Sequence, residues 1–384
     1  MEAAEPEKNN SHGEKILSKE NAKQPQDGKT PTWRVSRRSF MKGATTTAIA
    51  ATIAGPVMVT PGKAQASTVI RFADDGGRTG EGRAEHFVKP FMEATGIEVR
   101  TFVGQKDLAK MKAMVRTGNL EFDVITDGGS FLSPAGKDGL LEELDTSKLD
   151  LSTHLFPQWV WEHHIAWQYF SGGLGYNSDS ITDAPTSWAE YWDIERFPGR
   201  RGFRTRPQYT LEEALQADGV DPKDLYPLDV DRAFASLDRI KNDVRIWISE
   251  TAKTIEHLQT NELDYASTFS GRVLQAQGEG LPIGFAFEMT NSEPLTAALM
   301  KGAENQDACL QLVQWFLTGE SADGWFNAFG GYGPADSKIM DKLPESVTVN
   351  LPDPLNPKAN WVDVDWWGEN LEEVSKRYKE WLLT

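Results

Sequence analysis

After residue 67 the sequence alternates short β-rich runs with segments of helical periodicity, and this alternation limits the fold more than any other feature. Residues 106–117, for example, carry Leu108, Met111 and Met114 at spacings that fit a period of 3.6. The predicted strands cover residues 68–73, 97–103 and 122–126, and the predicted helices cover residues 82–95 and 106–117. Such alternation is typical of a mostly parallel, doubly wound α/β sheet.

Ligands of doubly wound sheets bind beside the carboxyl ends of the strands, where the strand order reverses. The loops after the first and third predicted strands are therefore candidate binding loops. The first contains Asp74 and Arg78, and the second contains Asp127 and Ser130. Residues 128–130 (Gly-Gly-Ser) are expected to open a helix, whose free backbone N–H groups favour an anion.

A chain of 384 residues exceeds the usual size of one core, so two domains are expected. The second α/β unit is predicted to begin near Gly172. The glycines of GGLGYN, residues 172–177, suit a strand that crosses between two domains at close approach. The predicted strands of this unit include 244–248 and 263–268, followed by an apolar run at 283–287. The predicted helices include 231–241, 253–259, 303–316 and 366–383.

The first 66 residues are interpreted as an export address. Residues 1–33 are polar and predicted to be disordered. Residues 34–66 hold an arginine pair followed by Phe40 and Lys42, a short apolar stretch, and a small-residue cleavage site ending at Ala66. This order is typical of a twin-arginine signal peptide, which implies export by that machinery to the periplasm. No cysteine lies near the cleavage site, so a lipoprotein anchor there is excluded.

Charge and motif content exclude several function classes. Residues 67–384 carry 30 Lys+Arg against 51 Asp+Glu, which disfavours nucleic acid and anionic membranes as partners. The single cysteine, Cys309, is predicted to be a small core residue. The common catalytic and phosphate-binding motifs are absent, so we expect neither an enzyme nor a cofactor. Adjacent His163 and His164 would point to opposite sides of an extended segment, so we expect no metal site.

Several segments together resemble the extracellular solute-binding proteins of the spermidine/putrescine-binding type. They are FMEATGIEV (91–99), FDVITDGG (122–129), GLLEELD (139–145), GGLGYNSDSI (172–181), APTSWAEYWD (184–193), LQTNELDYAST (258–268), LVQWFLTGESADGWFNAFGGYGPAD (312–336) and WWGENLEEVSKRYKEWL (366–382). The resemblance implies a monomeric, two-lobed periplasmic binding protein that delivers a small solute to the permease of an ABC importer. It implies lobe one at 67–170 plus 295–336, lobe two at 171–294 plus 337–384, and closure of the lobes around the ligand.

Matching the family pattern implies a ligand site in the cleft, but with altered charge. In the resembled family, certain acidic and aromatic residues contact the polyamine. The matching positions here are Arg206, Tyr209 and Phe269, and Arg272 follows shortly after. Among the matching acidic positions, only Glu293 retains a negative charge. Guanidinium groups suit carboxylate or phosphonate oxygens. We therefore expect an anionic or zwitterionic, amino-acid-like solute. Polyamine and neutral solutes remain alternative ligands. The arginines also have alternative roles: Arg204 and Arg206 could form a surface ion-pair cluster, and Arg272 could face solvent.

Two tyrosines complete the predicted binding residues. Tyr169, with its neighbour Trp167, precedes the crossing strand and is a candidate for contact with the ligand. Tyr332 lies in a GGYGP loop that approaches the ligand in the resembled family. The predicted ligand-binding set is Asp74, Arg78, Asp127, Ser130, Tyr169, Arg206, Tyr209, Phe269, Arg272, Glu293 and Tyr332.

Overall fold

The computed structural model describes residues 68–104, 106–319, 322–352 and 360–384. The predicted disordered extension and twin-arginine signal, residues 1–66, lie outside these ranges. Within these ranges, no helix combines the length and the apolar character needed to cross a membrane.

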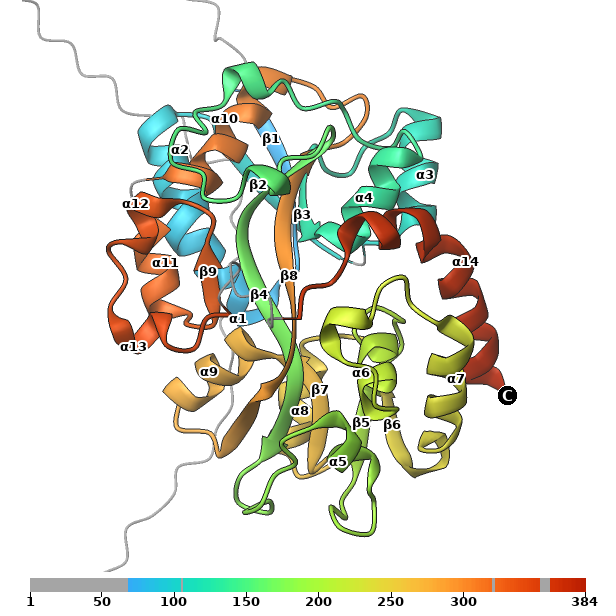
Figure 1. Cartoon of the computed structure of the whole chain (residues 1–384). Coiled ribbons are helices and arrows are strands. Elements are labelled where there is room, and N and C mark those ends of the chain that lie inside the picture. The colour runs from blue at the N-terminus through green and yellow to red at the C-terminus, as the bar shows by residue number, and fades with distance from the viewer. Residues whose placement is uncertain (1–67, 105, 320–321, 353–359) are drawn as a thin grey trace, which may run out of the picture. The chain divides into compact units, whose positions relative to one another are not determined.

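Nine strands in the described ranges form one mixed sheet in the order β2-β1-β3-β8-β4-β7-β5-β6, with β9 beside β4 (Figure 1). The strands are β1 Val69–Asp74, β2 Glu98–Val103, β3 Val124–Gly128, β4 His164–Asn177, β5 Arg201–Arg204, β6 Val244–Ile248, β7 Tyr265–Phe269, β8 Ile283–Leu299 and β9 Tyr332–Pro334. Strands β1 to β3 pair in parallel, as do β5 to β7. This arrangement agrees with the predicted α/β fold of two mostly parallel lobes.

The long strands β4 and β8 run antiparallel through the middle of the fold and belong to both parallel groups (Figure 1). One end of β8 pairs with β3, and one end of β4 pairs with β7. We call the part around β1 to β3 lobe one and the part around β5 to β7 lobe two. The register of the pair shifts between Gly172 and Leu174. A Cβ at Gly172 would lie 2.7 Å from the Tyr209 ring, so close approach requires glycine there.

Helices cover the faces of both parallel groups (Figure 1). They are α1 Gly77–Arg83, α2 Lys89–Thr95, α3 Leu108–Thr117, α4 Gly129–Lys137, α5 Trp188–Trp192, α6 Thr210–Ala217, α7 Val230–Asp238, α8 Lys253–Gln259, α9 Ser270–Gly278, α10 Gln306–Thr318, α11 Ala322–Ala328, α12 Ser337–Met340, α13 Glu345–Thr348 and α14 Val364–Leu383. A π-helical turn at Ala84–Val88 joins α1 to α2. Gly96 and Gly118 end α2 and α3 in the left-handed conformation, which other residues adopt at a cost.

Each lobe is built on buried apolar side chains. In lobe one the Phe72 and Phe87 rings both pack in tilted geometry against Phe316, with centroids 5.3 and 5.4 Å from it. Fully burying one such side chain stabilises the fold by about 1.5–3 kcal/mol. Cys309 is completely buried and has no disulfide partner in the described chain, so it packs as the small core residue that the sequence predicts.

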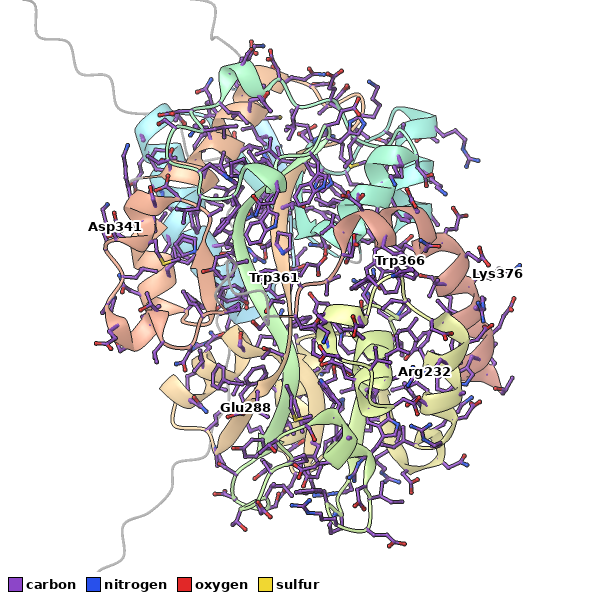
Figure 2. All side chains as sticks on the ribbon, in the orientation of Figure 1. Arg232, Glu288, Asp341, Trp361, Trp366 and Lys376 are labelled. Atoms are coloured by element: carbon purple, nitrogen blue, oxygen red, sulfur yellow. The ribbon has the colours of Figure 1, made fainter. Side chains whose placement is uncertain are left out.

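The C-terminal helix contacts both lobes. It packs against α4 of lobe one, and the Tyr378 hydroxyl donates to the carbonyl of Arg204 in lobe two at 2.9 Å. The chain reaches it past Trp361, which lies beside β4 (Figure 2). The amide of Ser337 donates to the carbonyl of Thr153 at 2.9 Å, which attaches α12 to the lobe-one segment before β4.

Candidate functional site

The carboxyl ends of β1 and β3 bring two aspartates to one buried lysine. The ammonium of Lys106 lies 2.6 Å from Asp75 Oδ1 and 3.1 Å from Asp127 Oδ2, and it donates to the carbonyl of Thr126 at 2.7 Å. Burial alone would lower the pKa of Lys106, but the two carboxylates outweigh it and raise the pKa. The lysine is therefore a fixed cation beneath Asp75 and Asp127.

Asp74 is held by an arginine of its own lobe. Its carboxylate lies 2.6 Å from Arg83 Nε and also accepts from the amide of Gly76. The aspartate is 1% exposed, whereas the neighbouring Asp75 keeps 34% of its side chain exposed. Of the two residues at the end of β1, Asp75 is thus the one accessible to a ligand. The sequence prediction names Asp74, which is fully buried against Arg83.

Lobe two presents a buried guanidinium that has no carboxylate partner among the described residues. Arg204, at the end of β5, is 7% exposed, and its Nη1 lacks a hydrogen-bond partner. Its guanidinium carbon lies 4.7 Å from the Phe269 ring centroid and 5.5 Å from that of Tyr209. Burial, reinforced by Arg206, lowers its pKa to about 10, so it remains charged at neutral pH. The surface ion-pair interpretation is wrong for Arg204, because the residue is buried and unpaired.

Arg206 and Arg272 are half-buried and, within the described ranges, form no ion pair. Arg206 is close enough to depress the pKa of Arg204. Arg272, in α9, is close enough to lower the pKa of Asp75 in lobe one. Both predicted arginines therefore lie within electrostatic range of the groups described above.

Glu293 connects the lobes from its position on β8. One carboxylate oxygen accepts from the amide of Ser130 at 2.6 Å, and the other accepts from the hydroxyl of Tyr209. Burial raises the pKa of Glu293, although these donors oppose the effect. Residues 128–130 do open helix α4, as predicted. The expectation of a free N–H at Ser130 is wrong, because Glu293 already occupies it.

Three rings form an apolar wall beside these charges. Phe170 and Tyr209 each lie against Phe269, with centroids 5.2 and 5.3 Å from it. Tyr169 points to the opposite face of β4, since successive strand residues alternate, and it packs against Trp361 in a separate cluster. At 1% exposure, Tyr169 is placed away from the ring wall. The neighbouring Trp167 packs in the lobe-one core rather than beside the ring wall.

Tyr332 and Arg78 mark places where the lobes touch. A Cβ on Gly271 would lie 2.2 Å from the Tyr332 ring, so β9 rests directly on the start of α9. Arg78, in α1, forms an ion pair with Glu279 after α9, and both side chains are exposed. Tyr332 and Arg78 thus sit at interlobe contacts rather than at free positions.

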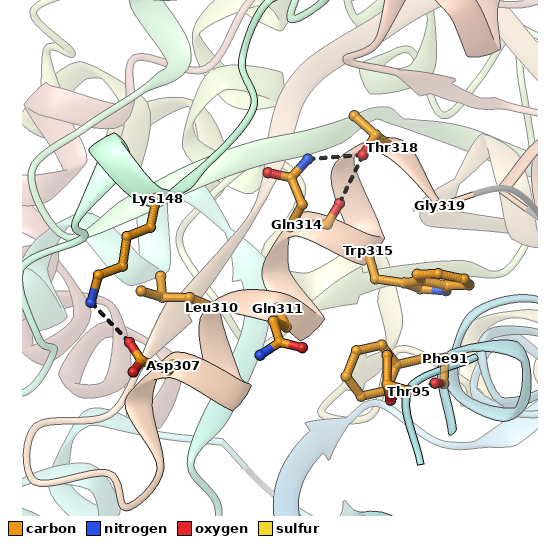
Figure 3. A pocket seen from close by; sticks show the side chains of 10 residues that line it. All are labelled: Phe91, Thr95, Lys148, Asp307, Leu310, Gln311, Gln314, Trp315, Thr318 and Gly319. Carbon is orange, nitrogen blue, oxygen red and sulfur yellow. Dashed lines mark hydrogen bonds and ion pairs between the residues drawn. The ribbon is translucent and has the colours of Figure 1, made fainter. Parts of the chain in front are cut away.

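A separate cavity of about 600 Å³ lies on lobe one between α2 and α10 (Figure 3). Its charged side chains, Lys148 and Asp307, pair with each other at 2.8 Å, and Gln314 donates to Thr318. The cavity therefore offers a ligand no unpaired charge, and we place the candidate site between the lobes.

Metal-binding geometry is absent from the described residues, which contain no cluster of three or more His, Cys, Asp or Glu side chains able to hold an ion. His164 is 2% exposed and stacks on Trp161 with a centroid distance of 4.6 Å. Burial lowers the pKa of His164 to about 3, so it is neutral. His163 turns its Nδ1 to the carbonyl of Glu142.

Comparison with known proteins identifies the family. The family model described as bacterial extracellular solute-binding protein matches residues 86–350. The chain belongs to this family. This solute-binding protein is 31% identical over 326 residues to the gamma-aminobutyric acid-binding protein of Pseudomonas aeruginosa, covering 83% of this chain and 91% of that protein. It is 24% identical to the spermidine/putrescine-binding periplasmic protein 1 of Haemophilus influenzae, covering 76% of this chain and 82% of that one.

Solved structures agree with this assignment. An ABC transporter substrate-binding protein from Bradyrhizobium japonicum matches with a TM-score of 0.76 and 27% identity, covering 82% of this chain and all of that one. The Atu4243–GABA receptor matches with a TM-score of 0.73 and 30% identity, covering 82% of this chain and 97% of that one. These matches agree with the sequence-based prediction of a two-lobed solute-binding protein.

Proposed function

We propose that this solute-binding protein captures a zwitterionic, amino-acid-like solute between its lobes and delivers it to the permease of an ABC importer. The observation that carries the proposal is the buried Arg204 guanidinium, which lacks a carboxylate partner among the described residues. A guanidinium presents several N–H groups in a planar fork that matches a carboxylate. In our proposal the solute's carboxylate supplies this missing partner, with Arg206 beside it.

The amino group of the solute would lie near Glu293, which forms no ion pair within the described residues, rather than near the aspartates that Lys106 holds. Asp127 contributes to the raised pKa of Glu293. An ammonium beside Glu293 would stabilise its ionised form. The ring wall of Phe170, Tyr209 and Phe269 would then cover the aliphatic part of the solute, and closure about β4 and β8 would enclose it.

The balance of fixed charge favours such a solute over a diamine. Five basic groups of the site, Arg83, Lys106, Arg204, Arg206 and Arg272, face Asp74, Asp75, Asp127 and Glu293. A fifth carboxyl, Glu213, also acts on Arg204, but burial raises its pKa to about 8, so it is mostly protonated at neutral pH. A diamine would bring two further positive charges into this surrounding. The relatives support both classes by name, gamma-aminobutyric acid at 31% identity and spermidine/putrescine at 24%. Polyamine binding is therefore the second candidate.

The cellular setting is part of the same proposal. Export through residues 34–66, cleavage after Ala66 and release as a soluble, unlipidated monomer in the periplasm would place the protein beside its permease. The periplasmic names of the spermidine/putrescine relatives support this location. The protein would act by binding alone, without catalysis or a cofactor. Lobe boundaries near residues 170 and 295 are likewise proposed from the crossing strands.

The test is the thermal melting of the purified protein against a panel of ω-amino acids, α-amino acids, dicarboxylates, diamines and sugars. A ligand at one hundred times its dissociation constant should add about 2.7 kcal/mol to the free energy of unfolding. We expect a shift with an amino acid and none with a diamine. A shift with diamines alone would overturn the proposed ligand class, and turnover of any compound would overturn the binding-protein assignment.

A further inference from the structure

Lys106 has its whole hydrogen-bonding capacity occupied inside lobe one. An ammonium group has three N–H donors. Those of Lys106 face three acceptors: Asp75 Oδ1 at 2.6 Å, Asp127 Oδ2 at 3.1 Å and the carbonyl of Thr126 at 2.7 Å. The side chain is 5% exposed. The lysine is thus a fixed cation that belongs to the site and does not reach out to solvent.

The carboxylates that Lys106 holds are those that a ligand's ammonium would otherwise use. Asp75 keeps 34% of its side chain exposed and Asp127 keeps 19%. Asp75 also lies 3.0 Å from Arg83, so it faces two cations at once. Within lobe one, these aspartates are therefore largely neutralised before any ligand arrives. A second ligand ammonium entering here would find Lys106 already in contact with both carboxylates. It could come no closer to either carboxylate than Lys106 does.

We propose that Lys106 is a specificity-determining residue that takes the place of a second ligand ammonium, admitting solutes with one amino group and excluding diamines. This inference rests on the proposed function and names how the same site rejects the polyamine alternative. Rejection by an unfavourable charge is a common source of specificity. A purely structural role, in which Lys106 only anchors α3 against β1 and β3, predicts a loss of stability without any change in ligand preference.

The test compares Lys106→Met with the wild-type protein by calorimetric titration of 4-aminobutanoate and of putrescine. Removing the cation makes the site more negative by one charge, which favours the doubly charged diamine over the zwitterion. We expect the ratio of the two dissociation constants to shift toward putrescine by about tenfold or more, because close charge pairs at interfaces are worth at least about 1.5 kcal/mol. An unchanged ratio in a folded variant would overturn the proposal.

Three further variants make the result decisive. Lys106→Gln keeps a donor for the Thr126 carbonyl and serves if Lys106→Met does not fold; it should show the same shift. Adding Asp127→Asn to Lys106→Met restores the net charge and should cancel most of the gain. Lys110→Met removes a nearby lysine in the first turn of α3, where it pairs with Glu121, and should leave the ratio unchanged.

The wild-type titrations keep this proposal separate from the proposed function. If wild type binds putrescine and not the amino acid, the proposed ligand class fails. If wild type binds the amino acid and Lys106→Met gains no putrescine binding, only the role of Lys106 fails. If wild type binds neither probe, a gain of putrescine binding in Lys106→Met still supports the proposal that Lys106 excludes a second ligand ammonium. The absence of such a gain refutes it.

Discussion

The hydroxyl of Tyr209, in lobe two, donates to the carboxylate of Glu293 on the crossing strand β8. The other oxygen of that carboxylate accepts from Ser130 at the start of α4 in lobe one. Tyr209 adopts a φ of 69°, which residues with a side chain rarely do, and such a conformation costs about 1–3 kcal/mol. The surrounding structure therefore holds Tyr209 in a strained position that connects the two lobes through one buried carboxyl.

Replacing Tyr209 with phenylalanine should weaken ligand binding about tenfold. The ring would stay in the wall with Phe170 and Phe269, but Glu293 would lose one donor, and an unsatisfied buried group costs about 1–3 kcal/mol. Calorimetric titration with the ligand found in the melting panel measures the change. Tyr226→Phe is the matched control, because Tyr226 donates to another buried carboxyl, Glu212, outside the site. It should lose stability and keep its affinity; equal affinity losses in both variants would contradict a role for Tyr209 in the site.

Replacing Arg204 with methionine should abolish binding of a carboxylate ligand without lowering the stability of the free protein. Arg204 is buried with no carboxylate partner in the described structure, and exchanging a buried charge for an apolar side chain of similar volume is often neutral or stabilising by about 1–4 kcal/mol. Urea unfolding of the free protein and ligand-induced melting shifts report the two effects separately.

Arg201 provides the control from the same strand. It is also buried, but its guanidinium donates to the carbonyls of Tyr191, Gly199 and Phe197. Arg201→Met should therefore destabilise the protein, since those carbonyls lose their partners. Comparable destabilisation by Arg204→Met and Arg201→Met would show that Arg204 is structural rather than held ready for a ligand.

Local sequence pattern predicted most of the fold, because strands and helices here follow their own periodicity. The bounds of β6 and α8 agree with the predicted residues 244–248 and 253–259. For β8 the sequence pattern marks only the apolar run 283–287, whereas the strand continues to Leu299. Its middle reads as a loop because it contains Asn291, Ser292 and a proline. These polar residues are nonetheless buried, since they pair with β4 rather than with solvent.

The candidate site was predictable only in outline. The rule that ligands bind at strand ends indicates Asp127 and the end of β1. The difference in exposure between Asp74 and Asp75 arises from tertiary packing, in which Asp74 is buried against Arg83. The sequence pattern favours Arg206 over Arg204, because the burial of Arg204 depends on its contacts with Tyr209 and Phe269, which the local sequence does not reveal. Lys106 appeared only as the start of a helix, although it too follows the carboxyl end of a strand.

The ion pair between Arg78 and Glu279 should slow ligand release modestly, and only at low salt. Both side chains are exposed, and exposed pairs contribute about 0–1 kcal/mol, which salt screens further. Glu279→Gln should raise the dissociation rate by less than about fivefold at low salt and leave it unchanged at high salt. Stopped-flow displacement measures this rate. Lys148→Gln, which removes an exposed pair with Asp307 away from the interlobe contacts, should have no effect. A large change that persists at high salt would point to a contact other than this pair.

Two adjacent buried glutamates should make the free protein less stable as the pH rises. Burial raises the pKa of Glu212 to about 7 and that of Glu213 to about 8. The folded state therefore binds more protons than the unfolded state above about pH 4.5, and the free energy of unfolding should fall from there to about pH 8 and then level off. Urea unfolding at a series of pH values measures this slope. Glu213→Gln, which cannot ionise and can still accept from Ser267, should flatten it, whereas Glu288→Gln at an exposed position (Figure 2) should leave it unchanged. A Glu213→Gln profile parallel to that of wild type would mean that Glu213 does not hold its proton in the fold.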